Sequence, residues 1–235
     1  IFFNLFAGGV LGKLSGFLRE GIFAFLFGIG TDISTVRLAL AYTLVPVNFF
    51  MTDAMAAVVV PGVKQATIKG RYEEKIFIIT GLFFVLIVSV AVSSILLFSN
   101  IWVGPLTGLN SEESKYLVSC LRLLSIFVPF YCLFNYLTYV DLAYGNSLLQ
   151  SIRPLVHNLS MIVGGVSGYL FSEIRVLFLV LALCYLVMAL YALRTVWSVL
   201  QSSFLGINDY SGDVFLAISR FLKSVAPVLI APVFL

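Results

Sequence analysis

Residues 76–98 read IFIITGLFFVLIVSVAVSSILLF and contain no Asp, Glu, Lys or Arg. A helix needs about 20 consecutive, mostly apolar residues to cross the hydrocarbon core of a bilayer. Other uncharged stretches approach that length, namely residues 123–140, 154–172 and 176–193. The sequence therefore predicts an all-α integral membrane protein.

The composition supports the same fold class. Of the 235 residues, 61% are hydrophobic and only 11% are charged, whereas a soluble domain carries about 25% charged residues. The 3 cysteines, Cys120, Cys132 and Cys184, all lie in apolar stretches, and no Cys/His spacing indicates a metal site. The net charge of +3 is too small to indicate nucleic-acid binding. Since no catalytic motif is present either, we expect neither an enzyme nor a bound cofactor.

The apolar stretches divide the chain into a series of helices. A charged loop is expected at 63–75, a turn-rich loop at 99–115 and a hydrophilic stretch at 201–213. Residues 1–212 are then expected to hold six transmembrane helices, and residues 213–235 are expected to begin a seventh; the resemblance described below implies that the six form one lobe of a transporter and that the seventh belongs to a second lobe. The six helices are expected at 1–29, 32–61, 76–98, 116–144, 152–171 and 175–199.

The basic residues give an orientation, because cytoplasmic loops of membrane proteins are enriched in Lys and Arg. With the N-terminus in the cytoplasm, most Lys and Arg residues lie at cytoplasmic loops and helix ends, including the dense basic cluster after the second helix. The inner residues are Lys64, Lys69, Arg71, Lys75, Arg153, Arg194, Arg220 and Lys223.

The first expected helix contains charges in the middle of an apolar span, at Lys13, Arg19 and Glu20. An ionised side chain at mid-bilayer costs at least about 2.5–3.5 kcal/mol, so it normally faces a cavity or a partner. Lys13 and Arg19 can line one broad cavity that holds an anionic headgroup. The alternatives are snorkelling to the cytoplasmic face and an ion pair with Asp53 of the second helix. Because Arg19 and Glu20 are adjacent and point in different directions, Arg19 is expected to be free for a ligand or another helix.

Two further features concern helix packing. Gly8, Gly12 and Gly16 follow one another at four-residue spacing, which gives a smooth face for close helix contact. His157 is a lone histidine in an apolar span, where a hydrogen-bonded packing residue is more common than a proton carrier. The glycosylation sequon at Asn158 is discarded because it lies within a span.

Several short motifs resemble the MurJ/MviN family of lipid II flippases. Residues 12–20 (GKLSGFLRE) are similar to the family's opening SRxxGxxRD, and residues 154–162 (PLVHNLSMI) are similar to its PTLLNISMI. Weaker matches are found at 27–30 (FGIG), 60–61 (VP), 128–130 (VPF) and 226–227 (AP).

This resemblance implies the N-terminal lobe of a MOP-type transporter in a bacterial cytoplasmic membrane. It implies a flippase that moves a polyprenyl-diphosphate-linked saccharide by alternating access, together with a C-terminal lobe of the same chain. Three charged positions of the family pattern carry Ser34, Val47 and Thr52 here, which leaves the glycan open. The open alternatives are a MATE-like exporter coupled to H⁺ or Na⁺ and a transport-inactive envelope scaffold. The expected substrate-binding residues are Lys13, Arg19, Glu20, Asp53 and Asn158.

Overall fold

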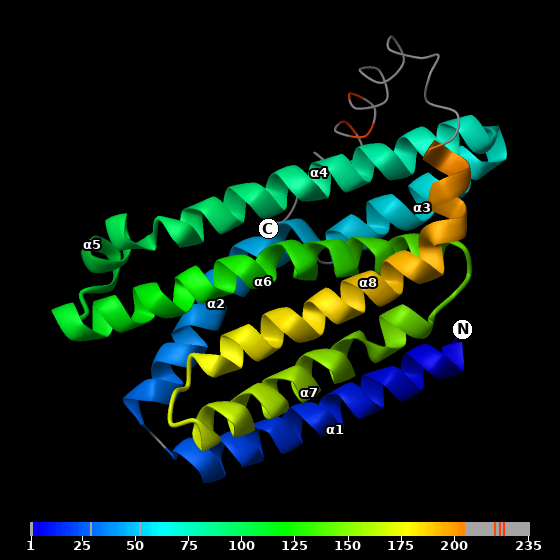
Figure 1. Cartoon of the computed structure of the whole chain (residues 1–235). Coiled ribbons are helices and arrows are strands. Elements are labelled where there is room, and N and C mark those ends of the chain that lie inside the picture. The colour runs from blue at the N-terminus through cyan, green and yellow to red at the C-terminus, as the bar shows by residue number, and fades with distance from the viewer. Residues whose placement is uncertain are drawn as a thin grey trace.

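The computed structural model describes residues 2–28, 30–51, 53–204, 219, 221 and 223. Within these residues the chain is almost entirely helical, and no strand occurs. The seventh helix expected at 213–235 lies almost wholly outside the described residues. Of the hydrophilic stretch expected at 201–213, residues 201–204 belong to the helix Val176–Phe204 and the rest lies outside the described residues. Figure 1 shows long helices that run back and forth beside one another, as expected for a helical bundle. The elements are α1 (Phe2–Phe27), α2 (Thr31–Met51), α3 (Asp53–Lys69), α4 (Arg71–Leu97), η1 (Ser99–Ile101), α5 (Val103–Thr107), α6 (Ser111–Ala143), α7 (Leu148–Leu170) and α8 (Val176–Phe204).

Four stretches of the described chain are long and apolar enough to cross a membrane, and together they make it a multi-pass membrane protein by length and composition. α1 and α7 are not among them, although they have 26 and 23 residues. The six-helix lobe therefore stays a prediction. The four spans are Ile33–Lys69, Arg71–Leu97, Ser111–Ala143 and Val176–Trp197.

The centre of the bundle is α6, which packs against α2, α3, α4, α7 and α8. Every residue from Phe134 to Asp141 is buried, so this part of α6 has no face left for solvent or lipid. The outer surface of the bundle is apolar instead, with Phe83, Leu86 and Ile87 of α4 all more than half exposed. Helices pair their own backbone N–H and C=O groups, so a helical bundle with an apolar outer surface is stable in hydrocarbon.

The charged loop expected at 63–75 is wrong. α3 continues to Lys69 and α4 begins at Arg71, so that Gly70 alone makes the connection. Gly70 has φ 128°, a conformation that only glycine adopts readily. The charges on either side of Gly70 stabilise the two helix ends. Lys69 lies in the last turn of α3, and Glu73 and Glu74 lie in the first turn of α4, so each charge interacts favourably with the helix dipole.

The turn-rich loop expected at 99–115 is shorter than predicted. It contains η1 and α5, and α6 already begins at Ser111. The side chain of Asn110 caps this helix by accepting a hydrogen bond from the Glu113 amide at 2.8 Å. The second expected helix, 32–61, corresponds to two elements: α2 ends at Met51, and α3 begins at Asp53.

Candidate functional site

α1 and α7 lie side by side along most of their length (Figure 1), and glycines of α1 allow this close approach. A Cβ atom added to Gly8 would lie 2.2 Å from the carbonyl oxygen of Ser151, and one added to Gly12 would lie 2.6 Å from Cβ of Pro154. Real Cβ atoms do not approach other atoms this closely. The predicted smooth face at Gly8, Gly12 and Gly16 is thus confirmed, and its partner is α7.

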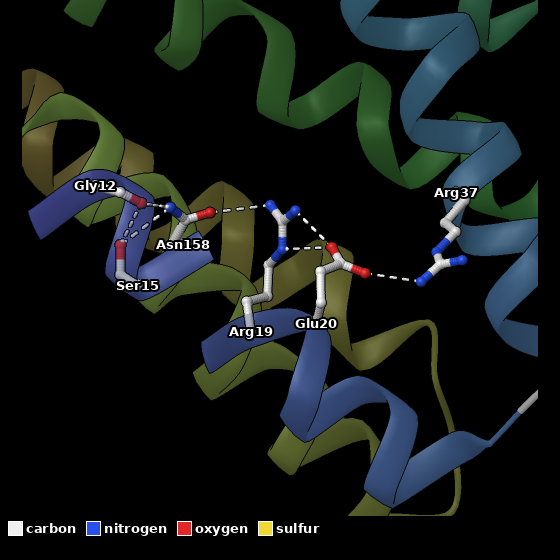
Figure 2. Close-up of polar contacts among 6 residues, drawn as sticks. All are labelled: Gly12, Ser15, Arg19, Glu20, Arg37 and Asn158. Atoms are coloured by element: carbon white, nitrogen blue, oxygen red, sulfur yellow. Dashed lines mark hydrogen bonds and ion pairs between the residues drawn. The ribbon is translucent and has the colours of Figure 1, made fainter. Parts of the chain in front are cut away.

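Asn158 connects the two helices through hydrogen bonds (Figure 2). Its Nδ2 donates to the carbonyl oxygen of Gly12 at 2.9 Å and to Oγ of Ser15 at 3.0 Å. Its Oδ1 accepts from Nη1 of Arg19 at 3.0 Å. Both donors and the acceptor of this amide are therefore used, as a buried amide requires. Asn158 fixes the position of Arg19 in the bundle.

The expectation that Arg19 would be free of Glu20 is wrong. Nε and Nη2 of Arg19 donate to Oε1 of Glu20 at 3.1 and 2.6 Å. Although adjacent residues leave a helix in different directions, their long side chains bend until the charged ends meet. The other oxygen of Glu20 accepts from Nη2 of Arg37 at 2.7 Å, which joins α1 to α2 (Figure 2).

The structure joins only part of the predicted site. Arg19, Glu20 and Asn158 form one connected cluster, whereas the Lys13 side chain is exposed and takes part in none of the hydrogen bonds and ion pairs found among the described residues. Lys13 therefore does not join the cluster. The side chain of Asp53 lies outside the described residues.

Arg153 on α7 is a candidate site residue that the sequence does not single out, because its position near a helix start is also typical of a cytoplasmic charge. Its Nη1 donates to the Tyr139 hydroxyl at 2.9 Å, and its guanidinium carbon lies 5.9 Å from the centre of the same ring. The Tyr139 hydroxyl in turn donates to the carbonyl oxygen of Met51 at 2.9 Å. In the described part of the chain, no carboxylate contacts Arg153.

His157 lies on α7 one turn after Arg153 and directly before Asn158, the partner of Arg19. Its Nδ1 is 3.2 Å from the hydroxyl of Tyr185, which agrees with the expected hydrogen-bonded packing residue. The charges of both Arg19 and Arg153 act on its ring. The spacing of Arg153 and His157, i and i+4 on α7, places them on one face and could have indicated this site from the sequence.

These residues come from α1, α2 and α7, and we group them under the name arginine strip. Among the described residues no hydrogen bond joins Arg153 or His157 to the cluster of Arg19, and the two parts meet through the neighbouring positions 157 and 158 of α7. Three arginines and one glutamate give the strip a net charge of +2. Near it, the hydroxyl of Tyr131 donates to Oδ1 of Asn48 at 2.9 Å, which adds neutral polar groups. The strip can therefore bind an anion through charge and hydroxyl-bearing groups through neutral partners. Its members are Arg19, Glu20, Arg37, Arg153, His157 and Asn158.

Comparisons with known proteins assign no family. No protein-family model matches the chain, and no curated protein matches it. The resemblance to the MurJ/MviN flippases therefore stays a prediction.

Proposed function

We propose that this chain is a lobe of a flippase that moves a polyprenyl-diphosphate-linked saccharide across the bacterial cytoplasmic membrane by alternating access. The observation that carries the proposal is Arg153, a guanidinium inside the bundle whose described partner is a neutral tyrosine. Among the described residues this charge has no counter-charge. A charge kept between helices in this way is costly, and such residues usually mark a substrate path.

The charges of the arginine strip suit a diphosphate. Guanidinium groups bind phosphate oxygens in a bidentate manner, and such charge-assisted hydrogen bonds are roughly twice as strong as neutral ones. Arg19 and Arg37 share the single carboxylate of Glu20, so their combined charge is only half neutralised. The net +2 of the strip matches the double negative charge that a diphosphate diester carries.

A lipid-linked cargo suits the surroundings of the strip better than a small soluble one. Next to Arg19 on α1, the side chains of Leu14, Phe17 and Leu18 are exposed by 61%, 83% and 55%. A polyprenyl chain can remain against such an apolar face in the bilayer while its headgroup reaches the arginines. A second lobe facing α1 and α2 would complete the cavity.

An exporter coupled to H⁺ or Na⁺ needs a carboxylate that is available to the ion. The candidate that the sequence offers for this role is Asp53, whose side chain lies outside the described residues. Glu20 of the strip already accepts from two guanidinium groups. This arrangement favours binding of an anion over binding of a cation.

Binding of a short polyprenyl-diphosphate saccharide to the full chain in detergent tests the proposal. Charge-assisted hydrogen bonds are worth about 1.5–3 kcal/mol, so Arg153→Gln should raise Kd by about tenfold or more. Arg153→Lys should recover part of the affinity because the charge remains. The matched control is Arg71→Gln, which removes one exposed charge at a helix end and should leave Kd unchanged.

The neutral polyprenol-linked saccharide, without phosphate, should bind at least tenfold more weakly to the wild-type chain. Equal affinity for the neutral and the diphosphate probes, or an unchanged Kd for Arg153→Gln, would contradict the proposal.

A further inference from the structure

A second basic site lies on other helices than the arginine strip. Side chains of the α5 region, the first turns of α6 and the start of α8 surround a groove of about 780 Å³, at the end of the bundle where α4 stops (Figure 1). Clefts that hold small molecules typically have volumes of about 300–1,000 Å³. The groove is therefore large enough for a headgroup and the first part of its acyl chains.

The charged groups of the groove are mostly positive. Lys115 and Arg122 are seven residues apart on α6, which places both on one face, and both line the groove. Neither forms an ion pair with any described residue. Among the described residues Arg122 donates only through Nε, to the carbonyl oxygen of Leu97 at 3.4 Å, and its Nη groups have no partner there.

The third cationic residue of the groove, Arg175, is paired with the carboxylate of Glu173. Nη2 of Arg175 lies 2.5 Å from Oε2 of Glu173. The hydrogen bond from Arg175 lowers the pKa of Glu173, so this carboxylate stays ionised at neutral pH. With three cations and one carboxylate, the wall of the groove carries a net charge of +2.

The position of the groove along α6 corresponds to the headgroup layer of a membrane. α6 has 33 residues, a length of about 50 Å at 1.5 Å per residue, whereas the hydrocarbon core is about 30 Å thick. The uncharged run of α6 starts at Leu123, directly after Arg122. Lys115 and Arg122 therefore precede the hydrocarbon, while Val118, Leu123 and Leu179 supply an apolar wall beside them.

We propose that this groove binds an anionic glycerophospholipid of the surrounding bilayer. Its phosphate lies between Lys115 and Arg122, and its upper acyl chains lie along Leu123 and Leu179. The site is separate from the arginine strip, so it serves as an anchor for membrane lipid and not as part of the transport path. A diester phosphate with one negative charge fits two unpaired cations, and basic pockets between transmembrane helices recognise such headgroups.

Thermal unfolding of the full chain in detergent, with phosphatidylglycerol or phosphatidylcholine added, tests this site. Phosphatidylglycerol should raise Tm more than phosphatidylcholine does, and the double variant Lys115→Gln/Arg122→Gln should lose that difference. The matched control is Lys64→Gln/Lys69→Gln, which removes the same charge from exposed residues of α3 and should keep it. Inorganic phosphate should have no effect, since the proposed ligand is a lipid and not a free anion.

A filling variant separates a seated lipid from counter-ions adsorbed on a basic surface. Ser119 lines the groove, so Ser119→Phe should abolish the phosphatidylglycerol shift while every charge remains. Circular dichroism of Ser119→Phe shows whether this variant folds. Leu179→Gln places an amide in the apolar wall and should also abolish the phosphatidylglycerol shift. A full shift in both the charge-loss and the filling variants, or a full effect of inorganic phosphate, would overturn the proposal.

Discussion

Replacing Gly8 by Ala should weaken the packing of α1 on α7, whereas the same change one residue later should not. The added Cβ of Gly8→Ala would lie 2.2 Å from the Ser151 carbonyl oxygen, and that atom belongs to the backbone, which cannot rotate away. Gly9 has nothing within 4 Å of the corresponding position. The two variants add the same methyl group to the same turn of helix, so Gly9→Ala is a matched control.

The structure sets the size of the effect. To bring the Gly8 contact from 2.2 Å to 3.0 Å, the helices must separate locally by about 0.8 Å, and a gap of 0.5–1 Å removes about a quarter to a half of the dispersion attraction of each atom pair. Overpacking of this kind typically costs about 1–3 kcal/mol. Both variants gain the same helix propensity, about 1 kcal/mol. Their difference in the free energy of unfolding therefore isolates the contact, and we expect about 1–3 kcal/mol.

Unfolding by SDS in mixed micelles, followed by circular dichroism, measures this free energy for both variants and for the wild type. Gly8→Ala should unfold at a lower SDS fraction than the wild type, and Gly9→Ala should unfold at an equal or higher one. If the two variants unfold at the same SDS fraction, the close approach of α1 to Ser151 is refuted.

Three further changes test other contacts. Asn158→Ala removes three hydrogen bonds between α1 and α7 and should lower the free energy of unfolding in mixed micelles by about 1–2 kcal/mol. Tyr136→Phe removes the hydroxyl that donates to the Ile78 carbonyl at 2.7 Å, and the same assay should show a loss of about 1 kcal/mol. For Glu173, whose pKa is lowered from 4.5 by Arg175, the stabilisation is present above pH 4.5 and is lost as the pH falls through the lowered pKa. Tm of the wild type should therefore drop slightly more than that of Glu173→Gln below pH 4.5, by the equivalent of less than about 1 kcal/mol, because the pair is exposed.

Which segments form helices could be predicted from the sequence, because long uncharged apolar runs have few other options in a membrane protein. Residues 76–98 lie within α4 apart from their last residue, Phe98, and residues 123–140 lie within α6. Helix ends were predicted less well. The charges at 63–75 predict a loop, yet the structure has two helices there, joined by one glycine. Lys69, Glu73 and Glu74 are good helix formers, and they stay helical because these helix ends can project beyond the hydrocarbon.

The site was predicted in part because some of its signals are local. The spacing of Gly8, Gly12 and Gly16 is visible within one helix, so the packing face could be found without knowledge of its partner. Arg19 and Arg153 are 134 positions apart in the sequence. Only the packing of α1 on α7 brings both charges close enough to act on His157. Tertiary proximity of this kind has no signature in a single sequence.

The pairing of α1 with α7 has a physical reason that also bears on function. These two long helices lie outside the set that is apolar enough to span a membrane by composition alone. Their polar groups satisfy one another through Asn158, Gly12 and Ser15, which removes amide and carbonyl groups from contact with lipid. Among the described residues, Arg19 and Arg153 are compensated only in part. Arg19 shares the carboxylate of Glu20 with Arg37, and Arg153 donates to the Tyr139 hydroxyl of α6. A pair selected only for stability could replace these charges by apolar residues at lower cost, and this cost is the reason why we propose that an anion binds there.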